Sequence, residues 1–385
     1  MESRYSADRA DWPRLARAGA RGQDALMPDG ETKASPFGRG FLTDLWYFAG
    51  LASEIAPGRL IRRELLGEPV MLGRTRTGDL FALQDICPHR AAPLSAGRLV
   101  READGSESVE CPYHGWRFGR DGRCRAIPSL TEQDLLDASR ISARRRSVAE
   151  SQGLVFVWMS SDGRSEPDSP PPLFPGVVGG RPKLVDRLDL ETHVDHAVIG
   201  LMDPAHGPFV HRQWWWRSRA SMHEKAKAFT AAPLGFQMTR HAPSRNSRAY
   251  RLLGGAPSTE ITFRLPGYRW EHIAAGRRQV LALTCLTPMC EKRTRITQII
   301  WSDHPAFLLA GPLVRAAARH FLRQDGEMVD LQRENLKNDP PLLWIDDADR
   351  QAKWYWALKR EWEVSRAEGR PFVNPVEPTL LRWRS

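Results

Sequence analysis

Residues 87–114 read CPHRAAPLSAGRLVREADGSESVECPYH, and this stretch contains two short blocks with the same kinds of metal-binding side chain. The first block places Cys87 two residues before His89. The second places Cys111 three residues before His114, with 21 residues between the blocks. Because each block offers one thiolate and one imidazole, the sequence predicts two loops that share one metal centre.

Two cysteines and two histidines are the ligands of a Rieske [2Fe-2S] cluster, in which the cysteines bind one iron and the histidines the other. A zinc ion is the alternative, but its ligands usually come as a CxxC block followed by an HxxxH block. The spacing therefore favours the cluster. Gly115 lacks a Cβ and would allow backbone N–H groups to approach the cluster sulfurs. Trp116 is expected either to shield the cluster from water or to pack in the core.

The segments CPHR at 87–90 and CPYHGWRF at 111–118 resemble the Rieske domain of the Rieske-type non-haem iron oxygenases. Respiratory Rieske proteins carry an extra cysteine in each loop, and this chain has other residues there. The resemblance therefore implies an oxygenase rather than a quinol oxidase subunit.

The sequence around these blocks predicts short strands. Residues 68–89 alternate and break at 77–79, which indicates a hairpin that leads into the first block. Residues 101–110 form a polar insertion typical of a solvated turn, and GLVFVWM at 153–159 predicts a buried strand. Residues 42–55, in contrast, show helical spacing. These elements predict an all-β module with the cluster at its loop tips.

The length of 385 residues and the hydrophobic content of 41% allow two domains with sizeable cores. We expect a basic, mobile extension over 1–41, the Rieske domain over 42–160 and a catalytic domain over 161–385, with a proline- and serine-rich linker at 160–172. No apolar run approaches the roughly 18 residues of a membrane span, and the N-terminus lacks the apolar region of a secretion signal. We therefore expect no membrane association.

The remaining three cysteines imply no disulfide framework, which favours a cytoplasmic location. Cys285 and Cys290 are expected to be small core residues, and Cys124 follows a turn at 121–124. The formal net charge of +10 is compatible with nucleic acid binding, but no recognition motif accompanies it. We expect the charge to steer an acidic redox partner, or to belong to a solvated surface.

A second set of metal-binding residues lies in LMDPAHGPFVH at 201–211. His206 and His211 are five residues apart, so an ideal helix would point them about 140° away from each other. Pro208 breaks regular helix, and we expect the two rings to converge through a distorted segment. Two histidines and a carboxylate form the facial triad of Fe(II) oxygenases, which leaves positions open for O2 and substrate. Two structural histidines are the alternative.

This segment is similar to the D-x-x-H-x-x-x-x-H segment of the vanillate demethylase, dicamba monooxygenase and pheophorbide a oxygenase group. The resemblance implies that Asp203 is the bridging aspartate, which connects an iron-ligand histidine to a Rieske histidine of a neighbouring subunit. Asp203 is alternatively, or in addition, a helix cap before Pro204. Many members carry Asn shortly before the aspartate, whereas this chain has Ile199 and Gly200.

The carboxylate ligand must come from later in the chain. FLRQDGEMVDLQRENL at 321–336 has helical character and resembles a family segment in which Asp precedes Gln by seven residues. Asp325 and Gln332 fit this spacing, so the resemblance implies Asp325 as the third ligand. Glu327 and Asp330 are competitors, and an exposed acidic helix face is the alternative.

Several polar and aromatic residues near the histidines have open roles. The triplet His193, Asp195 and His196 is expected either to support the site or face substrate, or to be ordinary polar residues. His193 or His196 as a rival iron ligand is the less favoured alternative. Trp214 to Trp216 either border the cavity or are buried at an interface. Cys285 to Trp301 predicts a hairpin that turns near 291–293.

These observations predict an α+β chain with an all-β Rieske [2Fe-2S] domain and a helix-grip catalytic domain around a curved antiparallel sheet. The resemblance implies the oxygenase component of a system in which NAD(P)H reduces the chain through an acidic ferredoxin, a flavin reductase or both. It also implies mononuclear Fe(II), an aromatic or polycyclic substrate and a homotrimer. The alternatives are an electron-transfer protein without the second iron and a ligand-binding protein without oxygenase activity.

Overall fold

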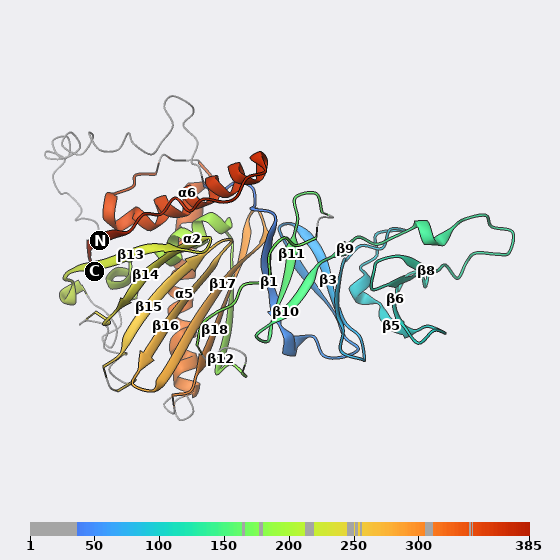
Figure 1. The fold of residues 1–385 in the computed structure, drawn as a ribbon, viewed down its shortest axis with the longest axis horizontal. Coiled ribbons are helices and arrows are strands. Elements are labelled where there is room, and N and C mark those ends of the chain that lie inside the picture. Colours follow the sequence, from blue (N-terminus) through green and yellow to red (C-terminus); the bar gives the residue numbers. More distant parts are fainter. Residues whose placement is uncertain are drawn as a thin grey trace, which may run out of the picture.

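The structure is a computed structural model that describes residues 37–163, 166–176, 180–211, 219–244, 250, 253–254, 256–304, 311–338, 340 and 342–385. Most of the expected N-terminal extension and Trp214 to Trp216 lie outside the described residues. The molecule is elongated, with small sheets at one end and one large sheet at the other (Figure 1). The two predicted sets of metal-binding residues therefore belong to different ends of the chain's fold.

Small antiparallel sheets form the end that carries the cysteine and histidine blocks. One sheet contains β1 (Leu45–Leu51), β11 (Leu154–Met159) and β10 (Val148–Ser151). The next contains β2 (Leu60–Leu65), β3 (Glu68–Arg74), β4 (Leu80–Gln84) and β9 (Arg145–Arg146). The outermost contains β5 (Arg98–Arg101), β6 (Glu107–Glu110), β7 (Arg117–Gly119) and β8 (Cys124–Ala126). Short 3-10 helices lie at Ala52–Glu54, Leu94–Ala96 and Ala138–Arg140.

The predicted helix over residues 42–55 is wrong, because its centre forms strand β1. All seven residues of β1 are buried. Tyr47 faces a core shared with the large sheet, whereas Trp46 and Phe48 face a second apolar cluster. A strand with apolar cover on both faces shows no alternation of polar and apolar residues, so its period is hidden in the sequence.

The other strand predictions for this end are confirmed. β3 and β4 form the hairpin that precedes Cys87, and β11 is the buried strand expected near 153–159. The polar insertion predicted over 101–110 turns only at 102–106, because Glu107–Glu110 form β6 and bury Ser108 and Val109 instead of exposing them to solvent.

The other end is built on an eight-stranded antiparallel sheet with the order β12-β18-β17-β16-β15-β14-β13-β19. β17 and β18 form the predicted hairpin, and Cys285 within it is fully buried. The bounds of the strands are β12 (Leu184–Leu190), β13 (Glu224–Ala232), β14 (Gly235–His241), β15 (Ser258–Arg264), β16 (Tyr268–Ala275), β17 (Arg278–Cys290), β18 (Arg293–Ser302) and β19 (Thr379–Arg384).

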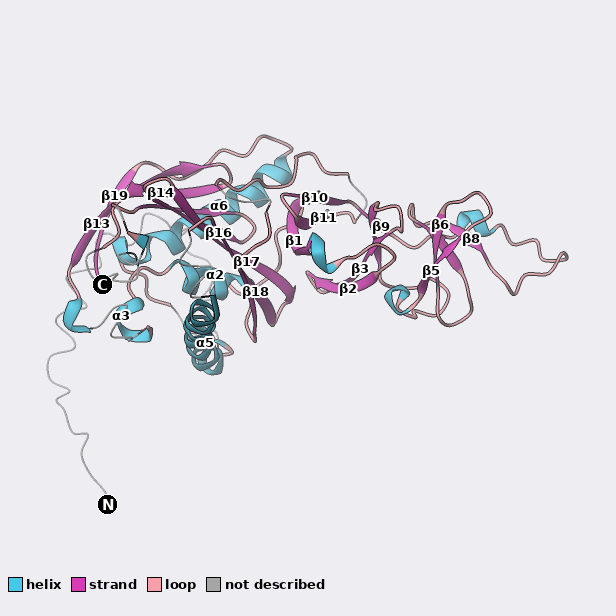
Figure 2. Cartoon of the chain, turned by 90° about the horizontal axis from the view of Figure 1, so that it is seen from below, coloured by secondary structure: helices cyan, strands magenta, loops and turns pink. Residues whose placement is uncertain are grey.

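Helices cover one face of this sheet (Figures 1 and 2). The long helix α5 (Gly311–Leu336) packs against β12, and α6 (Asp346–Glu368) packs against β19 and α2 (Val194–Met202). The short α3 (Gly207–Val210) contacts α5, and a 3-10 helix lies at Arg219–Ser221. This layered arrangement of helices on an antiparallel sheet confirms the predicted α+β class. None of the helices in the described part of the chain is both long and apolar enough to cross a bilayer.

Candidate metal centres

Two tight loops at the outer end of the molecule present the cysteine and histidine blocks. In the first loop, the backbone N–H of Ala91 donates to the carbonyl of Cys87. In the second, the N–H of Gly115 donates to the carbonyl of Cys111, and Gly115 has a φ of +72° that favours glycine. Each block therefore lies in one tight turn.

The side chains of the two loops are arranged as a cysteine pair and a histidine pair. Cys87 and Cys111 are 2% and 3% exposed and interact with each other. The ring centroids of His89 and His114 are 4.6 Å apart. Burial raises the pKa of the Cys87 thiol to about 11, so a bound metal would be needed to keep the thiolate at neutral pH.

The donor set fits a two-iron cluster better than one zinc ion. Nδ1 of His114 is buried and has no hydrogen-bond partner, as expected of an atom that binds a metal. A zinc ion would gather four ligand atoms around one point. Among the described residues, the group whose ligand atoms all lie within 4.8 Å of one another consists of His206, His211 and Asp325 and does not include the cysteines.

Trp116 lies against the histidine pair. Its ring stacks on His89 with a centroid distance of 4.5 Å and an interplanar angle of 6°. It also packs against the apolar core under the loops. The structure therefore unites both expected roles, since the indole covers one face of a candidate ligand and contributes to the core. Tyr113, in contrast, is 59% exposed beside His114, so this edge of the site faces solvent.

The second candidate centre lies where α2 ends and α3 begins. His206 is still in helical conformation at the start of α3, but His211 follows the helix with φ −95° and ψ 62°. This break turns the second ring back, and the two Nε2 atoms lie 3.2 Å apart. The predicted convergence of the rings through a distorted segment is confirmed.

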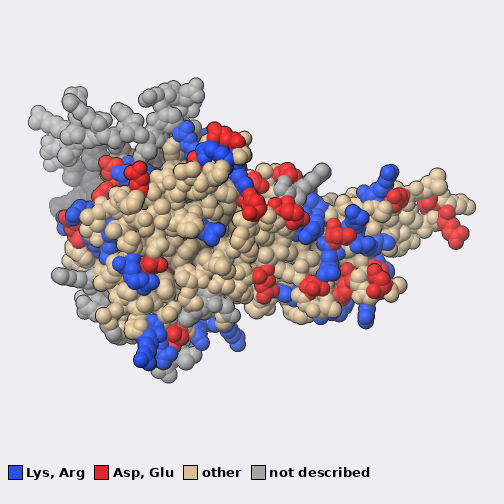
Figure 3. Space-filling model, viewed as in Figure 1, with Lys and Arg blue, Asp and Glu red and all other residues tan. Residues whose placement is uncertain are grey.

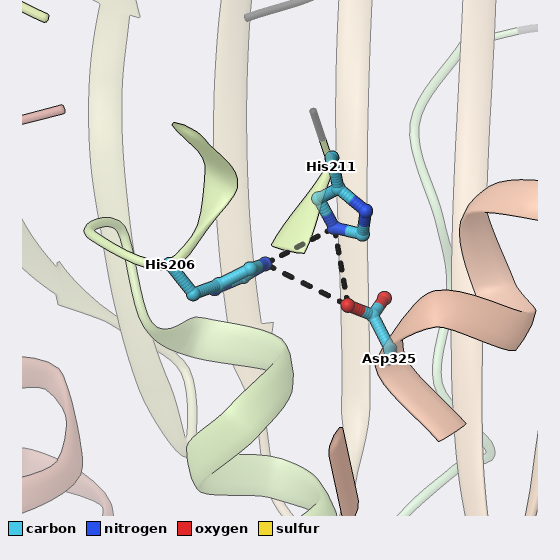
Figure 4. Close-up of side chains that lie close together, drawn as sticks. All are labelled: His206, His211 and Asp325. Atoms are coloured by element: carbon cyan, nitrogen blue, oxygen red, sulfur yellow. Dashed lines mark hydrogen bonds and ion pairs between the residues drawn. The ribbon is translucent and has the colours of Figure 1, made fainter. Parts of the chain in front are cut away.

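Helix α5 brings a carboxylate to the two histidines, as Figure 4 shows. Oδ1 of Asp325 lies 3.1 Å from Nε2 of His211 and 3.7 Å from Nε2 of His206. His211 is 2% exposed at its side chain, whereas His206 and Asp325 keep 24% and 31%. Three donor atoms on one side of a shared point fit a metal ion that keeps open positions on the other side.

The competitors for the carboxylate position point elsewhere. Glu327 and Asp330 are exposed on α5. Gln332, which supported the spacing argument, is also exposed. Residues on the same face of a helix are three or four positions apart. Glu327 and Asp330 are two and five positions from Asp325, so only Asp325 faces the histidines.

Sequence reasoning missed two residues that hold His211 in place. Oε1 of Gln324 lies 3.1 Å from Nδ1 of His211, and the ring of Phe321 stacks on the imidazole at 3.4 Å. A partner on Nδ1 fixes the tautomer and leaves Nε2 free to bind a metal. Phe321 precedes Asp325 by one helical turn, which is the signal that could have revealed this face of α5.

Asp203 lies next to His206 rather than inside a helix. It is the residue that ends α2, and its Oδ1 accepts the backbone N–H of Ala205. The expected cap therefore closes the turn after α2 instead of starting a helix at Pro204. Oδ2 of Asp203 lies 3.6 Å from Nδ1 of His206. Burial lowers the pKa of His206, but the nearby carboxylates of Asp203 and Asp325 outweigh it and raise the pKa.

The polar triplet at the start of α2 belongs to a buried network. Asp195 is fully buried, and its carboxylate accepts hydrogen bonds from Nζ of Lys359, Oη of Tyr355 and the N–H of Gly38. His193 caps α2 through the N–H of Asp195.

The ring of His196 packs directly against Gly38. Its Nε2 lies 2.9 Å from the position that a Cβ on Gly38 would occupy. The network joins the segment at residues 38–40 to helices α2 and α6. Among the described residues, neither His193 nor His196 belongs to a compact group of metal-binding atoms.

Two family models match the chain. The Rieske [2Fe-2S] domain matches residues 45–141, and the vanillate O-demethylase oxygenase C-terminal domain matches residues 193–357. The two matches follow the order of the two candidate centres along the chain. The chain therefore belongs to the Rieske-type non-haem iron oxygenases.

Known proteins place the chain within this family. Pheophorbide a oxygenase of Arabidopsis thaliana is 32% identical over 75% of this chain and 55% of its own length. This chain thus spans about half the length of that relative. The toluene-4-sulfonate monooxygenase system iron-sulfur subunit of Comamonas testosteroni is 38% identical over 33% of this chain and 34% of its own length.

Solved structures share the fold. A crystal structure of dicamba monooxygenase bound to dicamba has a TM-score of 0.68 over 86% of this chain and all of its own, at 21% identity. This likeness confirms the predicted arrangement of an all-β Rieske domain before a catalytic domain with a large antiparallel sheet.

Proposed function

We propose that the chain is the terminal oxygenase component of a Rieske oxygenase system and that it hydroxylates or oxidatively demethylates an organic substrate. The observation that carries this proposal is the convergence of His206, His211 and Asp325 in a chain that also carries the Rieske loops. An electron-transfer protein needs only the loops. A site with two imidazoles and one carboxylate on one side is useful only where O2 and substrate fill the other side.

The residues of each centre have separate tasks in this proposal. Cys87, His89, Cys111 and His114 would hold the [2Fe-2S] cluster, and His206, His211 and Asp325 would hold the iron. When bound, the cluster supplies single electrons and the mononuclear Fe(II) supplies the site of O2 activation. Gln324 keeps the proton of His211 on Nδ1, since its Oε1 accepts there. The Asp203 carboxylate lies 3.6 Å from Nδ1 of His206, where its charge acts on the ring without a direct hydrogen bond.

The large separation between the two centres supports the homotrimer. The Rieske loops and α3 lie at opposite ends of the elongated chain (Figures 1 and 2). A neighbouring copy could bring its Rieske loops to the partly exposed Asp203, whose side chain is 34% exposed. Asp203 would then connect a Rieske histidine of that copy to His206, as the resemblance implies.

The electron donor and substrate are proposed by class. The exposed edge at Tyr113 and the net charge of +10 suit an acidic ferredoxin or a flavin reductase that draws on NAD(P)H. The relatives' names point to aromatic and tetrapyrrole compounds, so we propose an aromatic or polycyclic substrate. The cytoplasmic location remains a prediction from cysteine usage.

The proposal is tested with the purified chain loaded with iron. We expect three irons per chain, a Rieske absorption spectrum, and O2 uptake that rises when an aromatic or polycyclic substrate is added with NADH and a surrogate reductase. Two irons per chain with an intact Rieske spectrum would indicate an electron-transfer protein. Three irons without any substrate-stimulated O2 uptake would favour the ligand-binding alternative.

A further inference from the structure

A cleft of about 560 Å³ lies between strand β9 and the segment that leaves β11, and none of the proposed metal ligands lines it. Its lining includes the three consecutive arginines Arg144, Arg145 and Arg146, together with Trp158. This volume is within the range of small-molecule sites. Basic side chains, with some acidic ones among them, lie around β9 in the space-filling view, beside the outermost small sheet (Figure 3).

Two buried N–H groups in this lining have no partner. Nε of Arg146 and Nε1 of Trp158 make no hydrogen bond among the described residues. Both residues are more than nine-tenths buried, with exposures of 3% and 2%. Buried donors in folded proteins are almost always paired, so two orphaned donors in the lining of one cleft indicate a missing acceptor.

Charge favours an anion as that acceptor. The guanidinium groups of Arg144 and Arg146 both approach Gly163. A Cβ built on Gly163 would lie 2.8 Å from Nη1 of Arg144 and 3.2 Å from Nη1 of Arg146. Arg146 is partly neutralised by Glu68 and donates to the carbonyl of Gly163. Arg144 makes no ion pair with any residue that the structure describes.

The carboxylates of the lining are already engaged. Asp121 pairs with Arg125 at 2.9 Å, and Glu166 pairs with Arg145 at 3.3 Å. Neither of them reaches the orphaned donors, because those donors have no partner. Water could satisfy a neutral donor, but hydrogen bonds between a guanidinium and an oxyanion are about twice as strong.

We propose that this cleft binds a small oxyanion, a phosphate or carboxylate group, through Arg144, the free Nε of Arg146 and Nε1 of Trp158. The bound group would tie β9 to the segment around Gly163. Pro88, which follows the candidate ligand Cys87, also lines the cleft. The anion would therefore sit behind the first Rieske loop, on a surface separate from the solvent-facing edge at Tyr113.

The test is calorimetric titration of the iron-loaded full chain at constant ionic strength, with inorganic phosphate in one arm, succinate in a second and chloride in a third. We expect one saturable site per chain for phosphate or succinate and none for chloride. Tighter binding of phosphate assigns a phosphate ligand, and tighter binding of succinate assigns a carboxylate.

Matched variants locate the site. Arg144→Gln is expected to weaken binding by roughly tenfold or more, because a charged hydrogen bond is lost. Arg140→Gln removes the same charge from a side chain that is 86% exposed outside the cleft, and it should change the affinity less than about twofold. Trp158→Phe keeps an aromatic ring but removes the N–H and should weaken binding several-fold.

Thermal unfolding of each variant separates misfolding from lost binding. If Trp158→Phe unfolds, the pair of arginine variants still decides the outcome. Absence of saturable binding to both oxyanions overturns the proposal, and so does an equal loss in Arg140→Gln and Arg144→Gln, which would indicate charge screening. A loss of affinity only for the redox partner in Arg144→Gln would also overturn it and assign the cleft to protein docking.

Discussion

The two candidate metal centres are built in opposite ways. All four proposed ligands of the cluster come from residues 87–114, on two loops at the tip of small sheets. The proposed ligands of the mononuclear iron come from the two ends of α3 and from α5. In the sequence, 113 residues lie between His211 and Asp325. The first centre is a nearly local structure, whereas the second exists only once helices pack on the large sheet.

The difference also shows in what surrounds each centre. One edge of the Rieske loops is open to solvent at Tyr113. His211, in contrast, is nearly fully buried and is held by Phe321 and Gln324. An electron carrier must touch its partners, while an O2-activating site must exclude water. Damage to one centre should therefore leave the other in place.

The largest expected effect comes from Asp325→Ala. The variant loses the proposed carboxylate ligand, so we expect two irons per chain instead of three and no substrate-stimulated O2 uptake, with the Rieske spectrum intact. Iron analysis and an oxygen electrode measure these changes. Glu327→Ala on the same helix is the matched control and should keep three irons, since Glu327 is exposed. Equal iron loss in both variants would contradict the assignment.

Cys111→Ala removes a proposed ligand of the cluster and tests whether the mononuclear iron site survives without it. We expect loss of the Rieske spectrum and of turnover, but one iron should remain per chain, because the large sheet and α5 do not depend on the outer loops. Visible absorption and iron analysis are the measurements. Loss of all iron would show that the two centres fold as one unit.

Asp195→Asn tests the core that supports the second centre. Breaking a buried ion pair costs about 3–5 kcal/mol, because Lys359 is left buried without its counter-charge. Urea unfolding should therefore show a loss of this size. Asp346→Asn is the matched control, since Asp346 pairs with Lys353 but is 68% exposed, and it should cost less than about 1 kcal/mol. A similar small loss in both would mean that the buried network contributes little.

Asp203→Asn should affect the link between the centres. The change keeps the shape of the side chain but removes the charge beside His206. Removing a partner of a metal-binding histidine typically costs 10–100-fold in activity or affinity, so we expect turnover to fall by about this factor. Both the Rieske spectrum and the iron content should stay close to those of the unchanged protein. Stopped-flow reduction of the cluster should be unchanged, which separates slow transfer between centres from a damaged donor site.

The smallest expected effect is on the pH dependence of stability. Burial alone would raise the pKa of Asp195, but the adjacent His193 ring and the ammonium of Lys359 hold it well below its usual value of 3.8. A lowered folded-state pKa adds stability that is present above pH 3.8 and is lost as the pH falls. Between pH 5 and pH 3.5 the unchanged protein should lose about 0.5–1 kcal/mol that Asp195→Asn does not lose. Parallel pH profiles of the two proteins would contradict this.

Local patterns were predicted well where one short segment decides the outcome. The hairpin of β3 and β4, the hairpin of β17 and β18, and the distorted segment after His206 were all readable, because turn residues and proline act on their neighbours. β1 was misread as a helix, because both of its faces are covered by distant parts of the chain. Gln324 and the partners of Asp195 were missed because they make contact with residues more than 100 positions away in the sequence.

By itself the sequence determined which chemical groups this protein offers: the thiolates and imidazoles at fixed spacing, and an acidic helix that follows a pair of histidines. Only the tertiary structure decided that Asp325, and neither Glu327 nor Asp330, meets the rings of His206 and His211. The physical reason is that spacing along the chain fixes geometry over a few residues, whereas a helix face is oriented by the packing of α5 against β12.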